Sequence, residues 1–367
     1  MGFFYLYDMS TKLQVIVPIF PDPLLCQLYF RNYIKYKHKY VDRLIIIIYS
    51  TPIRNRVMKD ANNEIIRRMG YDMETYRKHI EEIKQLLSQL NITNYDIKCY
   101  DEGGGHGEMF HVALNEIYDS DYHTLFDEQD AYWLNDNFKQ YVDQLNHLDL
   151  IGGIKSRIPY LETPEQLERF NKRFGTNHVN QLFTLHLPEF LSNRVIKQIK
   201  NFSGKQNNID PRTYADNVDV NTVFLDTFQT LNLDIYKITD KVKLIPYLEW
   251  DLIEDFYKKK PSINFDDYVL CHLGHAGSIA FMTFFEMCEM DDMNQHLSLI
   301  CRQSANPRYE VRFGFLYQAM DRISGFKYIT PYKKNMENGS TIISIDTNKP
   351  VMDLMEYNCY SLIERIL

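Results

Sequence analysis

The sequence predicts an α/β fold in which a mainly parallel sheet is flanked by helices. Two observations support this class. Short runs rich in β-branched residues alternate with segments of helical periodicity, and one run, LIIIIY at 44–49, is apolar without interruption. Alternation of strands with helices implies βαβ units, and an uninterrupted apolar run is typical of a parallel strand covered on both faces.

The expected elements follow one another in a regular order. Strands are expected at 13–19, 44–49, 95–100 and 123–126, and helices at 24–36, 59–90 (one or two, broken near Gly70) and 108–118. A further strand is expected to end in a turn at 150–154. Beyond it the pattern is less regular, with helices expected at 164–174, 188–200, 220–232 and 279–290 between short strands. These later segments are expected to form an extension that packs on the same sheet.

Composition excludes several classes of protein. The 367 residues include 41 basic and 49 acidic side chains, a net charge of −8, which disfavours general nucleic-acid binding through a positive field. The 6 cysteines form no CxxC pair, which argues against a zinc ribbon or a disulfide-stapled module. The sequence shows neither a signal-peptide pattern nor a long apolar run, so we expect a cytoplasmic protein without a transmembrane segment.

A glycine-rich turn at 103–107 opens the most informative window of the chain. Glycine lets the backbone approach a ligand closely, and the helix expected after the turn presents free N–H groups that suit an anion. The turn is not a Walker loop, because no GK[ST] follows. Alone, it is also compatible with a flexible turn.

Acidic residues then follow the strand expected at 123–126, in the tetrapeptide Asp127-Glu128-Gln129-Asp130. Carboxylates two residues apart at the end of a strand can hold a hard divalent cation that bridges diphosphate oxygens. A solvated acidic loop is the alternative. The apolar strand before the tetrapeptide and the aromatic Tyr132 and Trp133 after it favour the site, although both aromatic side chains are expected to pack in the core.

With these segments in view, the chain resembles a family-2 type glycosyltransferase of the GT-A fold. The resemblance implies an enzyme that transfers a sugar from a nucleotide-diphosphate donor, with a UDP-sugar favoured, to a carbohydrate or other hydroxyl acceptor, with inversion. The matching segments are VIVPIF (15–20), LIIIIYS (44–50), GGGHGEMFHVALNEI (103–117), YHTLFDEQD (122–130), YADNVDVNTVFLDTFQTLNLDIYKI (214–238) and CHLGHAGS (271–278).

The same resemblance assigns residues to the donor site. It implies Mn²⁺ or Mg²⁺ held by Asp130, Glu128 and His272. An alignment on Asp127-x-Gln129 is also possible, but Glu128-x-Asp130 is preferred because it keeps two carboxylates. The residues implied to contact the donor are Pro18, Phe20, Ser50, Gly107 and Glu128. Ser50 stands where many members have an aspartate that reads the base, which leaves the base unidentified.

The catalytic base is implied to be an acidic residue ahead of the amphipathic helix expected at 220–232. Asp219 is favoured and Asp216 comes second. Asp226 and the pair Glu254-Asp255 also compete for this role.

The resemblance further implies a division of the chain. Residues 1–155 would form the nucleotide-sugar-binding half, 156–290 the acceptor-binding and catalytic half of the same domain, and 291–367 a C-terminal extension. Two alternatives stand beside this function. A sugar-phosphate nucleotidyltransferase would ordinarily carry a Gly-rich loop with Arg and Lys after the first strand, where this sequence reads FPDPLL. A catalytically silent binding protein of the same fold is the other.

Overall fold

The architecture was determined from a computed structural model. It describes residues 12–19, 21, 23–49, 57–59, 65–68, 73–100, 121–155, 165, 168, 172, 185–201, 243–249, 263–273, 315, 318–319, 322–323, 331–335, 341–345 and 359–367.

A 6-stranded sheet forms the centre of the described structure, with the strand order β5-β2-β1-β6-β9-β8. The pairs β1–β2, β1–β6 and β2–β5 are parallel, whereas β9 runs antiparallel to both β6 and β8. The predicted α/β class with a mainly parallel sheet is therefore confirmed. The strands are β1 (Leu13–Pro18), β2 (Arg43–Tyr49), β5 (Tyr95–Tyr100), β6 (His123–Phe126), β8 (Leu150–Lys155) and β9 (Leu185–Leu191).

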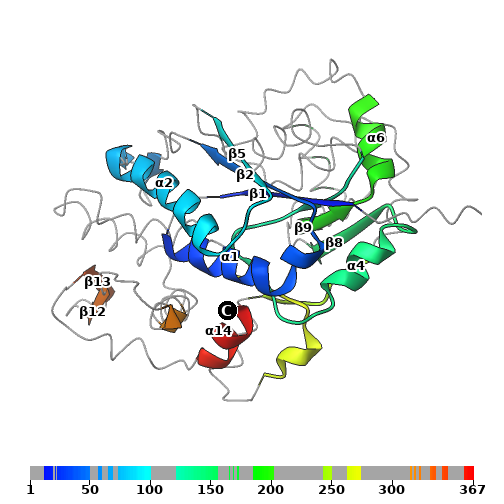
Figure 1. Ribbon diagram of the computed structural model, residues 1–367. Helices are drawn as coiled ribbons and strands as arrows, with labels where there is room; N and C mark the ends of the chain where they lie inside the picture. Colours follow the sequence, from blue (N-terminus) through cyan, green and yellow to red (C-terminus); the bar gives the residue numbers. More distant parts are fainter. Residues whose placement is uncertain are drawn as a thin grey trace, which may run out of the picture.

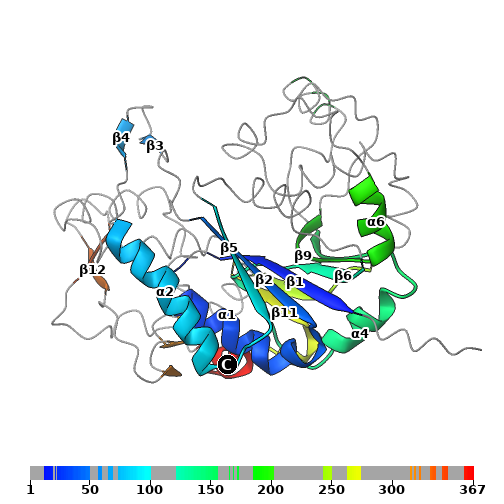
Figure 2. The same cartoon turned by 45° about the horizontal axis from the view of Figure 1, so that its top comes forward.

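Helices cover one face of this sheet and a further helix lies on the other side. Figures 1 and 2 show α1 (Pro23–Tyr36), α2 (Met73–Gln89) and α4 (Phe138–Gln144) on one side and α6 (Asn193–Asn201) on the opposite side. The short 3₁₀ helix η1 (His38–Tyr40) follows α1. Pro23 suits the first turn of α1, because its missing N–H would have no partner inside the helix.

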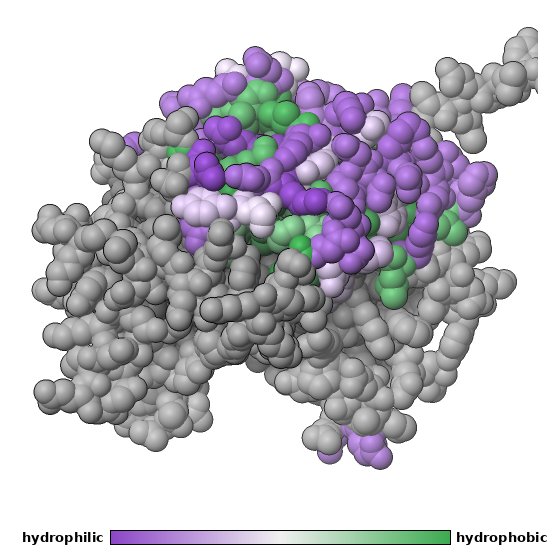
Figure 3. Space-filling model, turned by 90° about the horizontal axis from the view of Figure 1, so that it is seen from below, coloured by the Kyte–Doolittle hydropathy of each residue, from purple (hydrophilic) through white to green (hydrophobic). Residues whose placement is uncertain are grey.

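The main core lies between the sheet and helices α1, α2 and α4. Alternate residues of β1 and β2 face it, because successive side chains of a strand point to opposite faces. The opposite face of β1 and β2 is also buried, as expected for parallel strands in a doubly covered sheet. The core includes Val15, Val17, Leu44, Ile46, Tyr29, Phe30, Ile83, Leu87, Trp133 and Phe138. Viewed from below, hydrophilic residues dominate the described surface (Figure 3).

A second, 3-stranded sheet has the order β10-β11-β7. Strand β7 (Ala131–Trp133) follows the acidic tetrapeptide, while β10 (Tyr247–Glu249) and β11 (Leu270–His272) come from much later in the chain. The 3₁₀ helix η3 (Phe265–Asp267) leads into β11. Tyr132 and Trp133 are fully buried, so the prediction that they pack in the core is confirmed.

The C-terminal helix α14 (Tyr360–Ile366) packs against α1 (Figure 1). Asn32 joins α1 to both α14 and β7. Its side-chain amide donates to the carbonyls of Ile366 and Trp133, each at 2.9 Å, and its Oδ1 accepts from the Trp133 N–H at 2.8 Å. The remaining described strands form two antiparallel pairs, β3 (Val57–Lys59) with β4 (Ile65–Arg68) and β12 (Pro331–Asn335) with β13 (Thr341–Ile345).

Three local predictions are wrong. The helix expected from residue 59 onward begins only at Met73, because residues 65–68 instead pair with β3 as strand β4. The helix expected over 188–200 begins at Asn193, since Pro188 belongs to β9. Pro188 lacks an N–H and lies beside an irregularity where the β8–β9 register shifts between Gly152 and Ile154. The third wrong prediction is the turn expected at 150–154, because these residues belong to strand β8 (Leu150–Lys155).

The helices expected at 108–118, 220–232 and 279–290 lie outside the described residues, as does most of the one expected at 164–174. Among the helices that are described, none combines the length and the apolar character needed to cross a membrane.

Candidate metal centre

The acidic tetrapeptide lies at the carboxyl end of β6, as predicted. The Asp127 N–H donates to the Ile16 carbonyl at 2.9 Å, which extends the ladder between β1 and β6 by one residue. The chain then turns, and the Ala131 N–H donates back to the Glu128 carbonyl at 3.2 Å. The carboxyl ends of parallel strands are where open α/β sheets bind ligands. The backbone therefore presents this segment at the edge suited to a site.

The pairing of β7 with β11 explains why His272 reaches the tetrapeptide. These strands are antiparallel, with Ala131 opposite His272. The Leu273 N–H also donates to the Asp130 carbonyl at 2.9 Å. Residues separated by more than 140 positions are thus fixed side by side by backbone hydrogen bonds. The expected proximity of His272 and Asp130 is present.

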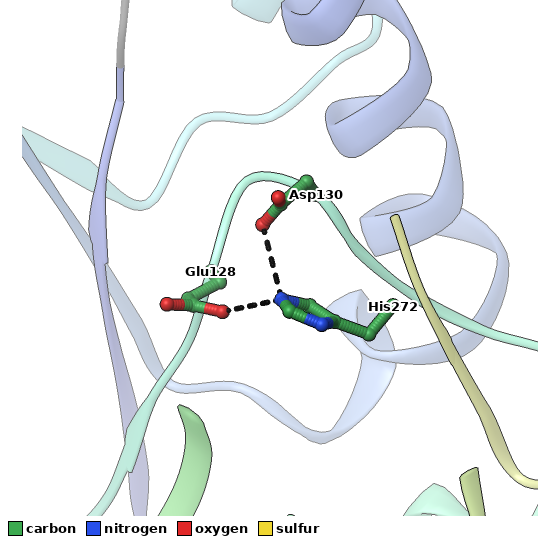
Figure 4. A group of neighbouring side chains, drawn as sticks. All are labelled: Glu128, Asp130 and His272. Carbon is green, nitrogen blue, oxygen red and sulfur yellow. Dashed lines mark hydrogen bonds and ion pairs between the residues drawn. The ribbon is translucent and has the colours of Figure 1, made fainter. Parts of the chain in front are cut away.

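Three side chains converge at this point: Glu128, Asp130 and His272 (Figure 4). The His272 Nε2 lies 2.9 Å from Glu128 Oε2 and 3.7 Å from Asp130 Oδ1. One ligand atom from each residue lies within 4.8 Å of the other two, and all three residues are buried. Two carboxylates and one imidazole form a donor set that could hold a divalent metal ion.

The remaining residues of the tetrapeptide contact α1 and the turn after it. Asp127 Oδ2 accepts from the Tyr29 hydroxyl at 2.7 Å and forms an ion pair with Lys37. Asp127 Oδ1 accepts from the Glu128 N–H at 3.1 Å. The Gln129 amide donates to Cys26 Sγ at 3.5 Å. The alternative alignment, Asp127-x-Gln129, therefore corresponds to the pair of side chains that contacts α1 rather than His272.

Burial dominates the electrostatics of this neighbouring network, where Asp127 and Lys37 are both inaccessible to solvent. Burial raises the pKa of Asp127 and lowers the pKa of Lys37, and the ion pair opposes both shifts. Burial, and then the charge of Asp127, raise the pKa of the Tyr29 hydroxyl, which therefore remains a hydrogen-bond donor at neutral pH. Burial likewise raises the pKa of the Cys271 thiol, which therefore stays protonated at neutral pH.

Of the other predicted site residues, the structure describes only Pro18. Pro18 ends β1 and pairs with Ile47, at the same edge of the sheet as the tetrapeptide. The remaining donor-contact and base candidates lie outside the described residues: Phe20, Ser50, Gly107, Asp216, Asp219, Asp226, Glu254 and Asp255.

Sequence reasoning missed the residues that surround Asp127. Lys37 stands in the polar run KYKHKY, where nothing distinguishes it from the neighbouring Lys35 and Lys39. Tyr29 lies in the helix expected at 24–36, where its position indicates only packing. One feature of the sequence could have suggested that Cys26 and Tyr29 contact the same segment. They are three residues apart, which places both on one face of α1.

Comparison with known proteins gives structural similarity only, because no protein-family model and no curated sequence match the chain. The galactosyltransferase LgtC, solved with donor and acceptor sugar analogues, has a TM-score of 0.37 and 9% identity over 75% of this chain and 94% of that chain. Glucosyl-3-phosphoglycerate synthase from Mycobacterium tuberculosis, solved with Mn²⁺, UDP and glucosyl-3-phosphoglycerate, has a TM-score of 0.34 and 13% identity, covering 64% and 69%.

A third solved structure, that of a synthase, has a similar TM-score and sequence identity. The 4-diphosphocytidyl-2C-methyl-D-erythritol synthase from Anaerococcus prevotii has a TM-score of 0.36 and 11% identity, covering 64% of this chain and 87% of that chain. At these TM-scores and identities, the chain shares only part of its backbone arrangement with the solved structures.

Proposed function

We propose that this protein is a metal-dependent glycosyltransferase of GT-A type. It would transfer a sugar from a nucleotide-diphosphate donor, with a UDP-sugar favoured, to a carbohydrate or other hydroxyl acceptor, with inversion. The observation that supports this most directly is the convergence of Glu128, Asp130 and His272 at the carboxyl end of a parallel strand. The sequence resemblance implies the same three residues as metal ligands.

The donor atoms fit a hard divalent cation. Carboxylate oxygens from Glu128 and Asp130 and the Nε2 of a neutral His272 would be its protein ligands. The chemistry that such an ion supplies is neutralisation of the negative charge on the diphosphate leaving group. To act as a ligand through Nε2, His272 must carry its ring proton on Nδ1. The Nε2 atom lies 2.9 Å from Glu128 Oε2 and 3.7 Å from Asp130 Oδ1, so the three ligand atoms face one point that a cation could occupy.

Other residues of the chain would orient the donor and activate the acceptor. Pro18, Phe20, Ser50 and Gly107 would contact the nucleotide-sugar together with Glu128. Asp219, or failing that Asp216, would accept the proton of the acceptor hydroxyl as it attacks the anomeric carbon. Replacement of the true base by Asn should lower kcat with little effect on donor affinity, because the base acts in the transition state.

The direct test is a donor screen with the full-length protein. Incubation with a panel of nucleotide-diphosphate sugars should release the nucleotide diphosphate when Mn²⁺ is present and not when EDTA is added. Asp130→Ala should abolish this release. Thermal shifts measured with the same panel identify which donor binds, since a ligand of the native state raises the melting temperature.

The same assay separates the alternatives. A sugar-phosphate nucleotidyltransferase would release pyrophosphate from a nucleoside triphosphate and a sugar 1-phosphate, and would leave nucleotide-diphosphate sugars intact. A catalytically silent protein would bind a donor and turn over neither substrate pair. Either result would contradict the proposed transferase.

A further inference from the structure

We propose that Asp127 and Gln129 are positioning residues that anchor the tetrapeptide to α1 and thereby hold Glu128 and Asp130 in the geometry for binding a cation. This inference deepens the proposed function and rests on the metal site assigned there. Neither residue would touch the cation or the donor. Their effect would pass through the backbone of residues 127–130.

The side chains of the tetrapeptide alternate between two partners. Asp127 and Gln129 contact residues of α1 and the turn that follows it, whereas Glu128 and Asp130 meet His272 of β11. Figure 4 shows Glu128 and Asp130 both directed toward the imidazole. A shift of one residue in this segment would exchange the two sets. The contacts with α1 therefore decide which carboxylates face His272.

Asp127 is the stronger anchor, since all its partners are buried and each bond involves a charged group. Lys37 and Tyr29 bind its Oδ2, while its Oδ1 accepts the N–H of Glu128 itself. Lys37 Nζ also lies 5.0 Å from the centre of the Tyr29 ring, in a cation–π arrangement. Charge-assisted bonds are stronger and more directional than neutral ones. Asp127 thus links α1 directly to the backbone of a proposed ligand.

Charge balance supports the same assignment. Three carboxylates within four residues would repel one another if they faced one cavity. Lys37 neutralises Asp127 on the α1 side of the segment, which leaves two carboxylates beside His272. The network therefore fixes the backbone and also removes one negative charge from the site.

Tyr29→Phe provides the most conservative test, and α1 supplies a matched control. Tyr33 lies one turn later on the same helix and is also buried, and among the described residues Asp127 hydrogen-bonds to Tyr29 but not to Tyr33. The Mn²⁺ affinity of the protein alone can be measured by electron paramagnetic resonance, because free Mn²⁺ gives the sharp signal. Loss of a group that orients metal ligands typically weakens affinity about 10–100-fold. We expect Tyr29→Phe to fall near the lower end of that range, and Tyr33→Phe to bind Mn²⁺ as the wild type does.

A second variant removes the ion pair without leaving a lone buried charge. The double variant Lys37→Met/Asp127→Asn keeps similar volumes and is expected to remain folded. It should weaken Mn²⁺ binding more than Tyr29→Phe does. Its melting temperature, compared with that of Tyr33→Phe, shows whether any loss of affinity follows from lower stability alone.

The outcomes distinguish this inference from the proposed function. If Asp130→Ala loses Mn²⁺ binding while Tyr29→Phe and the double variant bind as Tyr33→Phe does, the positioning role is wrong and the metal site stands. If Asp130→Ala binds Mn²⁺ like the wild type, the metal site is wrong and this inference falls with it. Weaker binding in both anchor variants, with normal binding in Tyr33→Phe, supports the positioning role.

Discussion

The two sheets of this protein are assembled in different ways. The parallel part of the central sheet joins β1, β2, β5 and β6, all from the first 126 residues, with α1 and α2 between strands of the same half. The small sheet joins β7 to β10 and β11, which are more than 110 residues away along the chain. The candidate site lies where the two meet, because the tetrapeptide leaves β6 and enters β7. Local periodicity predicts the first sheet well, whereas the second depends on contacts that periodicity does not encode.

The largest effect is expected at the junction itself. Asp130→Ala should remove both Mn²⁺-dependent donor binding and turnover, because it deletes one of two carboxylates in the donor set. The fold should survive, since its backbone pairing to Leu273 does not use the side chain. Donor titrations with Mn²⁺ and with EDTA, together with a melting curve, provide the measurement. Donor binding by the wild type that persists in EDTA would show that this junction is not the metal site.

The next effect concerns stability on the α1 side of the junction. Lys37→Met alone leaves Asp127 buried and without its cation, and breaking a buried pair in this way costs about 3–5 kcal/mol. Urea unfolding at pH 7 measures the loss. Adding Asp127→Asn to this variant should recover most of the lost free energy of unfolding, because the isolated charge is then removed. A small loss in the single variant would mean that Asp127 takes up a proton or is reached by water once Lys37 is gone.

A smaller effect is expected where α1 supports the second sheet. Asn32→Ala leaves the buried N–H of Trp133 without the side-chain acceptor it has in the wild type. An unsatisfied buried polar group costs about 1–3 kcal/mol. Lys35→Ala is the matched control, because Lys35 bonds to carbonyls of α14 on an exposed surface and should change stability by less than about 0.5 kcal/mol. Equal losses in the two variants would contradict a special role for Asn32 in holding β7.

The contrast between the sheets also explains which strands and helices could be predicted from the sequence. Strands β1, β2, β5 and β6 and helix α1 were predicted within about two residues. Strands β1 and β2 have long apolar runs, and β5 and β6 follow the alternation of strands with helices. Strand β4 was assigned to a helix, since four residues do not distinguish the two periods. The helix expected at 188–200 covers the last four residues of β9 (Leu185–Leu191), since Pro188 also suits the first turn of a helix. A shift of register beside Pro188 allows it to lie in the strand instead.

The candidate site shows the same division. Glu128 and Asp130 were found from their position after an apolar strand, and His272 was found through the family resemblance. The ion pair of Lys37 with Asp127 could not be found, because a lysine at the end of a helix is ordinarily solvated. Its burial depends on the packing of α1 against the end of β6, which no local pattern records.

The last predicted effect lies at the opposite end of β6 from the site. His123 opens this strand, and its Nδ1 accepts from the Asn193 N–H at 2.9 Å at the start of α6. Burial, reinforced by the positive charge of Arg194, lowers the pKa of His123 to about 4, against an ordinary value of 6.5. The neutral imidazole is therefore the form that the folded state favours.

The sign of the pH dependence follows from this shift. Between about pH 6.5 and pH 4 the unfolded chain binds a proton at His123 and the folded chain does not, so the contribution to stability is complete above pH 6.5 and declines as pH falls. His123→Asn keeps an acceptor for the Asn193 N–H and cannot titrate. Urea unfolding at several pH values from 7 to 4.5 should therefore give a shallower decline for His123→Asn than for the wild type, while Mn²⁺ affinity at pH 7 stays unchanged. Parallel declines would show that His123 titrates alike in the folded and unfolded chains, and an altered Mn²⁺ affinity would show that the two ends of β6 are not independent.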